Sequence, residues 1–304
     1  MSRPNRHTLF VDDDALLSGN NVPEQRVLPR GTLLLPHQTS QPRASGDKPP
    51  RPQSRFPVKR VSEEGGRLVP VISGSPWNHY ENRYRVRHGS SFGIITSRRE
   101  PCRQSMIRTI SGRNADEQIQ NIRQLCHENI VRSIEIYACS DAGYFLISEF
   151  MPTSLMHLCR APIYPNEPQL SSILHQVLSG VEFLLANGFV HEQLSCANIL
   201  VNFDGDVKIC DVERCTGSGD TSKLMDSFCR VMMRLMDKEK NTAGVVGLTR
   251  PGDWSQEAVD LFTLTTIRPS VKQLLSHEFM GRKDKQELVW LIPLVLITAH
   301  HNRE

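Results

Sequence analysis

Residues 188–211 read GFVHEQLSCANILVNFDGDVKICD, and this stretch decides the fold. A helix is expected to end just before it, because the pair Asn187-Gly188 suits the left-handed turn that follows a helix. A polar loop then runs to Asn198. Two short apolar runs, Ile-Leu-Val and Val-Lys-Ile, flank Asp204-Gly205, which is a strong hairpin signal. The stretch therefore predicts a helix that leads into a polar loop, and a β-hairpin that places Asp211 just past its second strand.

The same stretch resembles the catalytic loop and metal-binding segment of eukaryotic protein kinases. The family pattern is H-R-D-L-K-x-x-N-I-L, then a hairpin, then D-F-G. Here H-E-Q-L-S-C-A-N-I-L runs from His191 to Leu200, and D-V-E runs from Asp211 to Glu213, without a gap in register. The resemblance covers about residues 80–285. It implies an α+β, bilobal protein-kinase-like fold, with a small β-rich N-lobe and a helical C-lobe.

The departures from the family pattern fall on the chemistry, and no catalytic residue is intact. Gln193 stands where the kinase Asp accepts a proton, and a neutral amide cannot act as that base. Ser195 replaces the Lys that contacts the transferring phosphoryl group. Asn198 and Asp211 match the two metal ligands of the family. A local role stays open for both, because Asn198 could tie the loop backbone together and Asp211 could cap a turn.

The expected nucleotide-binding residues are also altered. Residues 84–95 predict a strand, a turn and a strand, similar to the glycine-rich loop of kinases, with Gly93 kept in register and Gly89 one place off. Glycine matters there because backbone amides must approach phosphate oxygens. Arg108 takes the place of the kinase Lys, which is not a conservative exchange at a fitted site. Gln118 falls where the next helix should carry the Glu partner of that Lys.

The residues expected to border an adenine give a mixed picture. Met106 replaces a small Ala, and extra methylenes in a close-packed pocket cost roughly 1–3 kcal/mol. Tyr144–Met151 resembles the fifth strand and hinge, so Glu149 and Met151 would offer backbone groups to the ring. ATP and Mg²⁺ are therefore expected to bind weakly or not at all.

The remainder of the chain predicts a helical C-lobe without a substrate platform. Helices are expected from Pro168 to Ala186, from Leu224 to Met236, and from a capping box at Asp253 onward. The segment after Asp211 is short and lacks the A-P-E motif, so Arg268 of R-P-S-V needs a partner other than the family's Glu. The apolar run from Leu288 to Ala299 is too short to span a bilayer and predicts a buried terminal helix.

Composition sets the domain boundaries and the compartment. Residues 1–78, rich in Pro, Ser and Arg, predict a disordered extension. Residues 79–285 are expected to form the kinase-like domain, and residues 286–304 an apolar helix and tail.

The 304 residues carry a net charge of +3, which does not indicate a nucleic-acid-binding surface. The 8 cysteines form no C-x-x-C pair, and no signal peptide is recognised. A cytoplasmic or nuclear protein that binds neither nucleic acid nor membrane is expected.

These observations predict a pseudokinase, a binding or scaffold module for protein partners. They favour a protein without enzymatic activity over an enzyme. One alternative is a residual ATP-dependent Ser/Thr protein kinase that uses Arg108, Asn198 and Asp211. A second alternative is a decayed or truncated kinase gene product. The amino-acid sequence of the C-terminal part is most similar to that of kinase-like proteins of filamentous fungi.

Overall fold

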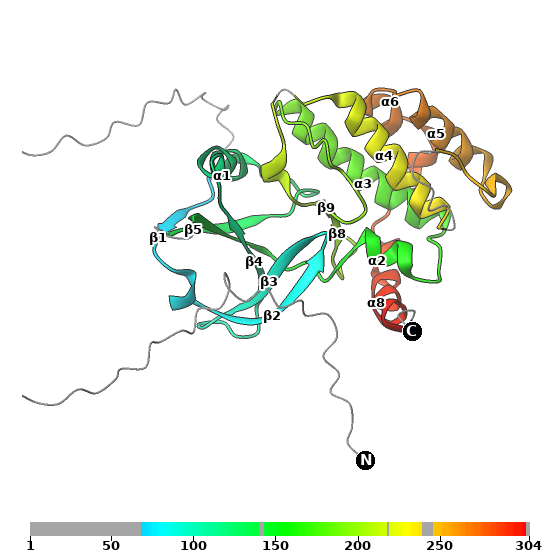
Figure 1. Ribbon diagram of the computed structural model, residues 1–304. Helices are drawn as coiled ribbons and strands as arrows, with labels where there is room; N and C mark the ends of the chain where they lie inside the picture. Colours follow the sequence, from blue (N-terminus) through cyan, green and yellow to red (C-terminus); the bar gives the residue numbers. More distant parts are fainter. Residues whose placement is uncertain (1–67, 140–142, 218, 239–245, 302–304) are drawn as a thin grey trace, which may run out of the picture. The chain divides into compact units, whose positions relative to one another are not determined.

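The computed structural model describes residues 68–139, 143–217, 219–238 and 246–301 (Figure 1). A β-sheet comes first along the chain and a group of helices follows, with a small second sheet at the junction. This is the α+β, protein-kinase-like fold that the sequence predicts.

The first sheet has six strands in the order β1-β5-β6-β4-β3-β2. β1 pairs with β5 in parallel, and every other neighbouring pair is antiparallel. The predicted strand, turn and strand of residues 84–95 are confirmed as β2 and β3, and β5 and β6 form another antiparallel pair. A single helix, α1 (Ala115–Gln124), follows β4 and lies against the sheet. The strands are β1 (Val71–Ser73), β2 (Tyr80–His88), β3 (Ser90–Ser97), β4 (Gln104–Ile110), β5 (Ser133–Cys139) and β6 (Gly143–Glu149).

The folded part begins earlier than the boundary at residue 78 predicts. β1 pairs with β5, and the 3-10 turn η1 (Pro76–Asn78) brings Trp77 into edge contact with Phe145, with ring centroids 5.8 Å apart. Ile72 and Trp77 pack on the hydrophobic cluster of the sheet. Residues 68–78 therefore belong to the domain, and the predicted disorder of residues 1–67 lies outside the described residues.

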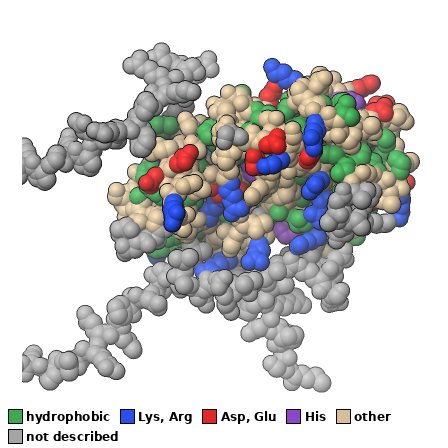
Figure 2. Space-filling model, turned by 45° about the horizontal axis from the view of Figure 1, so that its top comes forward, with side chains coloured by type: hydrophobic (Ala, Val, Ile, Leu, Met, Phe, Trp, Pro, Cys, Tyr) green, Lys and Arg blue, Asp and Glu red, His purple; other side chains and the backbone are tan. Residues whose placement is uncertain are grey.

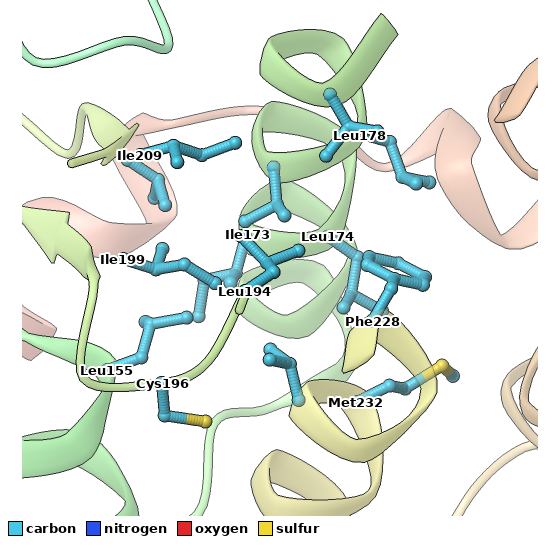
Figure 3. Close-up of a cluster of buried hydrophobic side chains, with 14 of the residues drawn as sticks. Leu155, Ile173, Leu174, Leu178, Leu194, Cys196, Ile199, Ile209, Phe228 and Met232 are labelled. Atoms are coloured by element: carbon cyan, nitrogen blue, oxygen red, sulfur yellow. The ribbon is translucent and has the colours of Figure 1, made fainter. Parts of the chain in front are cut away.

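The helical part is built around α3 (Glu167–Ala186), which is confirmed close to its predicted bounds. Asn166 and Gln169 form a capping box at its start, and Gly188 takes the predicted left-handed conformation after its end, with φ 78°. Figure 3 shows the buried core where α3 meets α4 and the hairpin strands. The other helices are α2 (Leu155–Arg160), α4 (Thr221–Met236), α5 (Gln256–Thr266), α6 (Val271–Leu275), α7 (Gln286–Val289) and α8 (Leu291–His301).

The predicted hairpin of residues 199–209 is the link between the two parts. β8 (Ile199–Val201) and β9 (Val207–Ile209) form a small sheet with β7 (Thr153–Ser154). Gln176 of α3 accepts a hydrogen bond from the Val207 amide at 2.8 Å and donates to the Gly205 carbonyl at 3.0 Å. Because both backbone groups are buried, a helix side chain fixes the hairpin that carries Asp211.

One sequence prediction about the helices is wrong, and two others are met. The cap of α5 is Ser255, whose hydroxyl accepts from the Ala258 amide at 3.3 Å, so the predicted capping box at Asp253 is wrong. Arg268 finds its alternative partner in Asp226 of α4, with two N–O distances of 2.9 Å. α7 and α8 form the predicted terminal helical segment and bury residues such as Leu288 and Val295.

None of the helices in the described ranges combines the length and apolar character needed to cross a bilayer. On the face shown in Figure 2, acidic and basic side chains lie interspersed among polar and hydrophobic ones. Some large apolar side chains are exposed, notably Ile267 at 74% and Ile297 at 61%.

Substitution of two glycines can show whether the contact with Lys285 holds the hairpin of residues 199–209 in place. Gly205 and Gly188 have φ of 77° and 78°, but a Cβ on Gly205 would collide with the Lys285 carbonyl, whereas one on Gly188 would meet nothing within 4 Å. The left-handed conformation alone costs an alanine about 1–2 kcal/mol. We expect Gly205→Ala to lower the free energy of unfolding by clearly more than Gly188→Ala, as measured by urea titration. Equal losses would mean that the contact with Lys285 is not part of the fold.

Candidate nucleotide site

The centre of the site is Arg108, which ends up between two carboxylates. Arg108 lies on β4, while Asp211 follows β9 and Glu213 lies on the 3-10 turn η2 (Val212–Arg214). Its guanidinium is 2.5 Å from the Asp211 carboxylate and is also paired with Glu213. The three side chains are only 11%, 5% and 7% exposed. One cation from the sheet is therefore buried with two anions from the segment after the hairpin.

The surroundings of Arg108 keep it charged. Burial alone would lower the pKa of the guanidinium, but the negative charges of Glu213 and Asp211 outweigh that effect and raise the pKa above its ordinary value. The guanidinium also lies 5.6 Å from the centroid of the Phe92 ring, a cation–π distance. Arg108 therefore contacts two carboxylates and one aromatic ring.

Asp211, one of the two predicted metal ligands, has both carboxylate oxygens engaged by the protein. One oxygen pairs with Arg108, and the other accepts a hydrogen bond from the Ser90 hydroxyl at 2.9 Å. The backbone of Asp211 is left-handed, with φ 60°, a conformation that Asp tolerates better than most residues. Asp211 thus connects β3, β4 and the end of the second hairpin.

Asn198, the other predicted metal ligand, has its amide turned into its own loop. Its Oδ1 accepts from the Ser195 amide, and its Nδ2 donates to the Gln193 carbonyl, both at 2.8 Å. This is the predicted alternative, in which Asn198 ties the loop backbone together. Within the described ranges, no group of three or more His, Cys, Asp and Glu side chains could hold a metal ion.

The remaining loop residues divide between solvent and core. Gln193, at the base position, is exposed, and Ser195 is partly exposed. His191 is buried, and its Nε2 lies 3.1 Å from the Cys210 carbonyl, which makes Nε2–H the donor. Its Nδ1 is buried without a hydrogen-bond partner. Burial lowers the pKa of His191, so the ring is neutral in the folded chain.

The two predicted phosphate-loop glycines serve close packing on different sides. A Cβ on Gly89 would lie 2.8 Å from the Ala197 Cβ, so the β2–β3 turn rests directly on the polar loop. A Cβ on Gly93 would lie 2.8 Å from Ile107 Cγ2. Because Ile94 pairs with Met106, Phe92 and Ile94 share the face of Met106, and Gly93 belongs to the opposite face. Gly93 therefore lies on the face of the sheet that carries Ile107, opposite to the face of Met106.

The place expected for an adenine is filled by apolar side chains. Phe92, Met106 and Met151 are at most 2% exposed, and they pack in one cluster that bridges the first sheet and β8. Glu149 accepts from the Arg132 amide at 2.6 Å and pairs with Lys208 at 2.9 Å, while its own amide donates to the Arg132 carbonyl at 3.0 Å. The cluster consists of Phe92, Ile94, Met106, Val131, Met151, Leu200 and Cys210.

The residues expected to hold ATP and Mg²⁺ are in contact with other groups of the protein. Asp211 and Asn198 are hydrogen-bonded within the protein, the β2–β3 turn contacts the polar loop, and Met106 and Met151 belong to a buried apolar cluster. Sequence reasoning missed Ser90 and Glu213 as members of the site. The signal for Glu213 was present, because an acid two places after Asp211 replaces a glycine while Gln118 removes the acid expected on α1.

The charge cluster makes a stability prediction. Arg108→Met leaves two buried carboxylates without their cation, and breaking a buried pair typically costs about 3–5 kcal/mol. Arg268→Met is the matched control, because its pair with Asp226 is 55% and 42% exposed and exposed ion pairs contribute little to stability. Urea unfolding at neutral pH should show the large loss for Arg108 only. A similarly small loss in both variants would contradict the buried cluster.

His191 predicts a dependence of stability on pH. The folded chain holds the ring neutral, whereas the unfolded chain binds a proton below a pKa of about 6.5. The free energy of unfolding should therefore fall as the pH drops from 7 to 5. His191→Gln keeps a side-chain N–H donor and should flatten this slope in urea titrations. Part of the slope should persist, because burial also lowers the pKa of His127 and His175.

Comparison with known proteins agrees with the fold. A family model described as "Protein kinase domain" matches residues 99–232. A probable serine/threonine-protein kinase mkcB of Dictyostelium discoideum is 24% identical over 91% of this chain and 46% of its own length. A cyclin-dependent kinase 12 of Caenorhabditis elegans is 32% identical over 32% of this chain and 15% of its own. The serine/threonine-protein kinase ste20 of Emericella nidulans is 25% identical over 59% of this chain and 22% of its own.

The chain spans less than half the length of these curated relatives. Its described part nevertheless carries the sheet, the loop and the helices in the order of a kinase. Residues 99–232 thus match the protein kinase domain, and the described part of the chain has a protein-kinase-like fold with Ser/Thr kinases among its distant relatives.

Proposed function

We propose that this kinase-like domain is a pseudokinase, a protein-binding module that does not transfer phosphoryl groups. The observation that carries the proposal is the engagement of Asp211: one carboxylate oxygen is paired with Arg108, and the other accepts from Ser90. Arg108 and Ser90 each use one lone pair of this carboxylate, and the positive charge of Arg108 opposes the approach of a metal cation.

The polar loop supports the same reading. Gln193 has an amide where a kinase needs a carboxylate base, and an amide does not accept the proton of a substrate hydroxyl. Ser195 lacks the positive charge that a lysine would bring to the transferring group. Each such effect contributes orders of magnitude to the rate in an intact enzyme.

The short segment after Asp211 also supports the proposal, because in the family this segment helps to position the peptide substrate. Thr216 and Val190 exchange two backbone hydrogen bonds at 3.0 and 3.2 Å, so the chain returns at once to the residues before the loop. α4 already begins at Thr221. The side chain of Arg268, which pairs with a Glu of this segment in the family, is held by Asp226 instead. Little chain is left here to position a peptide for phosphoryl transfer.

The rival function is a residual Ser/Thr protein kinase, favoured by the names of the relatives and by the presence of Arg108, Asn198 and Asp211. In that case, restoring the base with Gln193→Asp should raise activity toward a generic substrate protein. Under the proposal it should not, because the base is only one of the altered parts. The third reading, a decayed product, predicts a broad unfolding transition instead of a cooperative one.

Thermal unfolding of the full chain with ATP, Mg²⁺ or both tests the proposal. A ligand that binds the folded state with a Kd one hundredth of its concentration stabilises by about 2.7 kcal/mol, which shifts Tm by roughly 5–10 °C in a domain of this size. We expect no shift at millimolar nucleotide. A magnesium-dependent rise in Tm would refute the closed site.

A reopened variant provides the control for that measurement. Ser90→Ala together with Met106→Ala frees one oxygen of Asp211 and shortens a side chain of the apolar cluster. If the cleft is closed by these contacts, this variant should gain a nucleotide-dependent shift that the native chain lacks. The same variant without Met106→Ala should gain less, because the apolar cluster would still be filled.

A further inference from the structure

Cys159 and Cys196 bring two free thiols into contact from segments 37 residues apart. Their sulfur atoms share a hydrogen bond at 3.7 Å. Cys159 lies on α2, and Cys196 lies in the polar loop between Ser195 and Asn198. The Met156 amide donates to the Cys196 carbonyl at 2.8 Å, so the backbones of the two segments are already joined beside the sulfurs.

The two thiols differ in access to solvent. Cys196 is 1% exposed, and Figure 3 shows it next to Leu155 at the edge of the hydrophobic cluster. Cys159 is only partly buried. Cys159 is therefore the more accessible of the two residues, and its sulfur lies 3.7 Å from that of Cys196.

The surroundings of Cys159 are positively charged. Lys238 donates through its Nζ to the carbonyls of Leu158 at 2.7 Å and Ala161 at 2.8 Å, which flank Cys159 on and after α2. The hydrogen bond with Cys196 lowers the pKa of the Cys159 thiol against the opposing effect of burial, and the charges of Arg234, Lys238 and Arg160 act in the same direction. The same hydrogen bond and burial raise the pKa of Cys196. Cys159 is thus the more exposed thiol, and the basic residues around it favour its thiolate, as an attacking cysteine requires.

We propose that Cys159 and Cys196 are a peroxide-sensitive dithiol that closes to a reversible intrachain disulfide. The Cys159 thiolate attacks one oxygen of hydrogen peroxide; an S–O bond forms, the O–O bond breaks, and hydroxide leaves and takes up a proton as water. The Cys196 sulfur then attacks the sulfenic sulfur; the S–S bond forms, the S–O bond breaks, and hydroxide leaves with the Cys196 proton as a second water. Peroxide is reduced by two electrons and the thiol pair is oxidised by two.

The disulfide would tie α2 to the loop held by the Asn198 amide. Such a crosslink stabilises a fold mainly by restricting the unfolded chain, and a loop of this length gives an effect in the ordinary range. The oxidised chain should therefore melt at a higher temperature than the reduced chain, and a thiol reductant should reverse the change.

The test is peptide mapping of the full chain after treatment with hydrogen peroxide and alkylation without reductant. We expect a crosslinked peptide pair that contains Cys159 and Cys196, its loss after dithiothreitol, and a rise in Tm of roughly 5–10 °C in the oxidised form. Both cysteines recovered fully alkylated at peroxide concentrations that oxidise exposed Cys102 would overturn the proposal. A disulfide that forms but lowers Tm would overturn the inference that the contact is built for it.

Single variants separate the roles of the two sulfurs. Cys196→Ser should leave a sulfenic acid on Cys159 that dimedone traps, whereas Cys159→Ser should give neither the disulfide nor a dimedone adduct on Cys196. Cys229→Ser is the matched control, because Cys229 is buried and its sulfur contacts the Thr265 hydroxyl at 3.0 Å; this variant should crosslink like the native chain. A dimedone adduct on Cys196 in the absence of Cys159 would reverse the assigned order of attack. The native-chain mapping stands even where a variant fails to fold.

Discussion

The arrangement of the cleft depends on how the buried charge of Arg108 is balanced. Taking a guanidinium out of water is costly unless anions with good geometry surround it. At the position of α1 where the family has such an anion, this chain has the uncharged Gln118. The carboxylates of Asp211 and Glu213 supply it instead, and both come from the segment after β9. A charge on the sheet is thereby paired with the segment that also carries the expected metal ligand.

The pairing of Arg108 with Asp211 explains why several other residues contact the same region. Once Asp211 is held by Arg108, its second oxygen is turned toward β3, where Ser90 donates to it. The β2–β3 turn then lies on the polar loop, and only a glycine at position 89 permits the contact with Ala197. Phe92 covers the guanidinium from the sheet side and joins Met106 and Met151 in one apolar cluster. Polar and apolar contacts thus occupy the same cleft together.

The sequence predicted the parts of the fold that have local signals. The turn at Gly205, the left-handed residue Gly188 and the apolar stripe of α3 each depend on neighbouring residues, and the structure has all three. β1 was missed, because three residues become a strand only through pairing with β5. The neighbours of Gly93 were not predicted either, since the pairing of β3 with β4 decides which face of the sheet each residue joins. These failures come from long-range pairing, which a local pattern does not contain.

The candidate site shows the same limit more sharply. Comparison with the family pattern identifies departures one position at a time, as at Gln193, Ser195 and Met106. The pairing of Arg108 with Glu213 cannot be found in this way, because it joins residues 105 positions apart. The substitution at position 213 looks like a loss when taken alone. Next to Arg108 it compensates for the acid missing from α1, and Ser90 satisfies the carboxylate oxygen that Arg108 leaves. The contacts of Arg108, Asp211, Glu213 and Ser90 join segments that lie far apart in the sequence, so no single position predicts them.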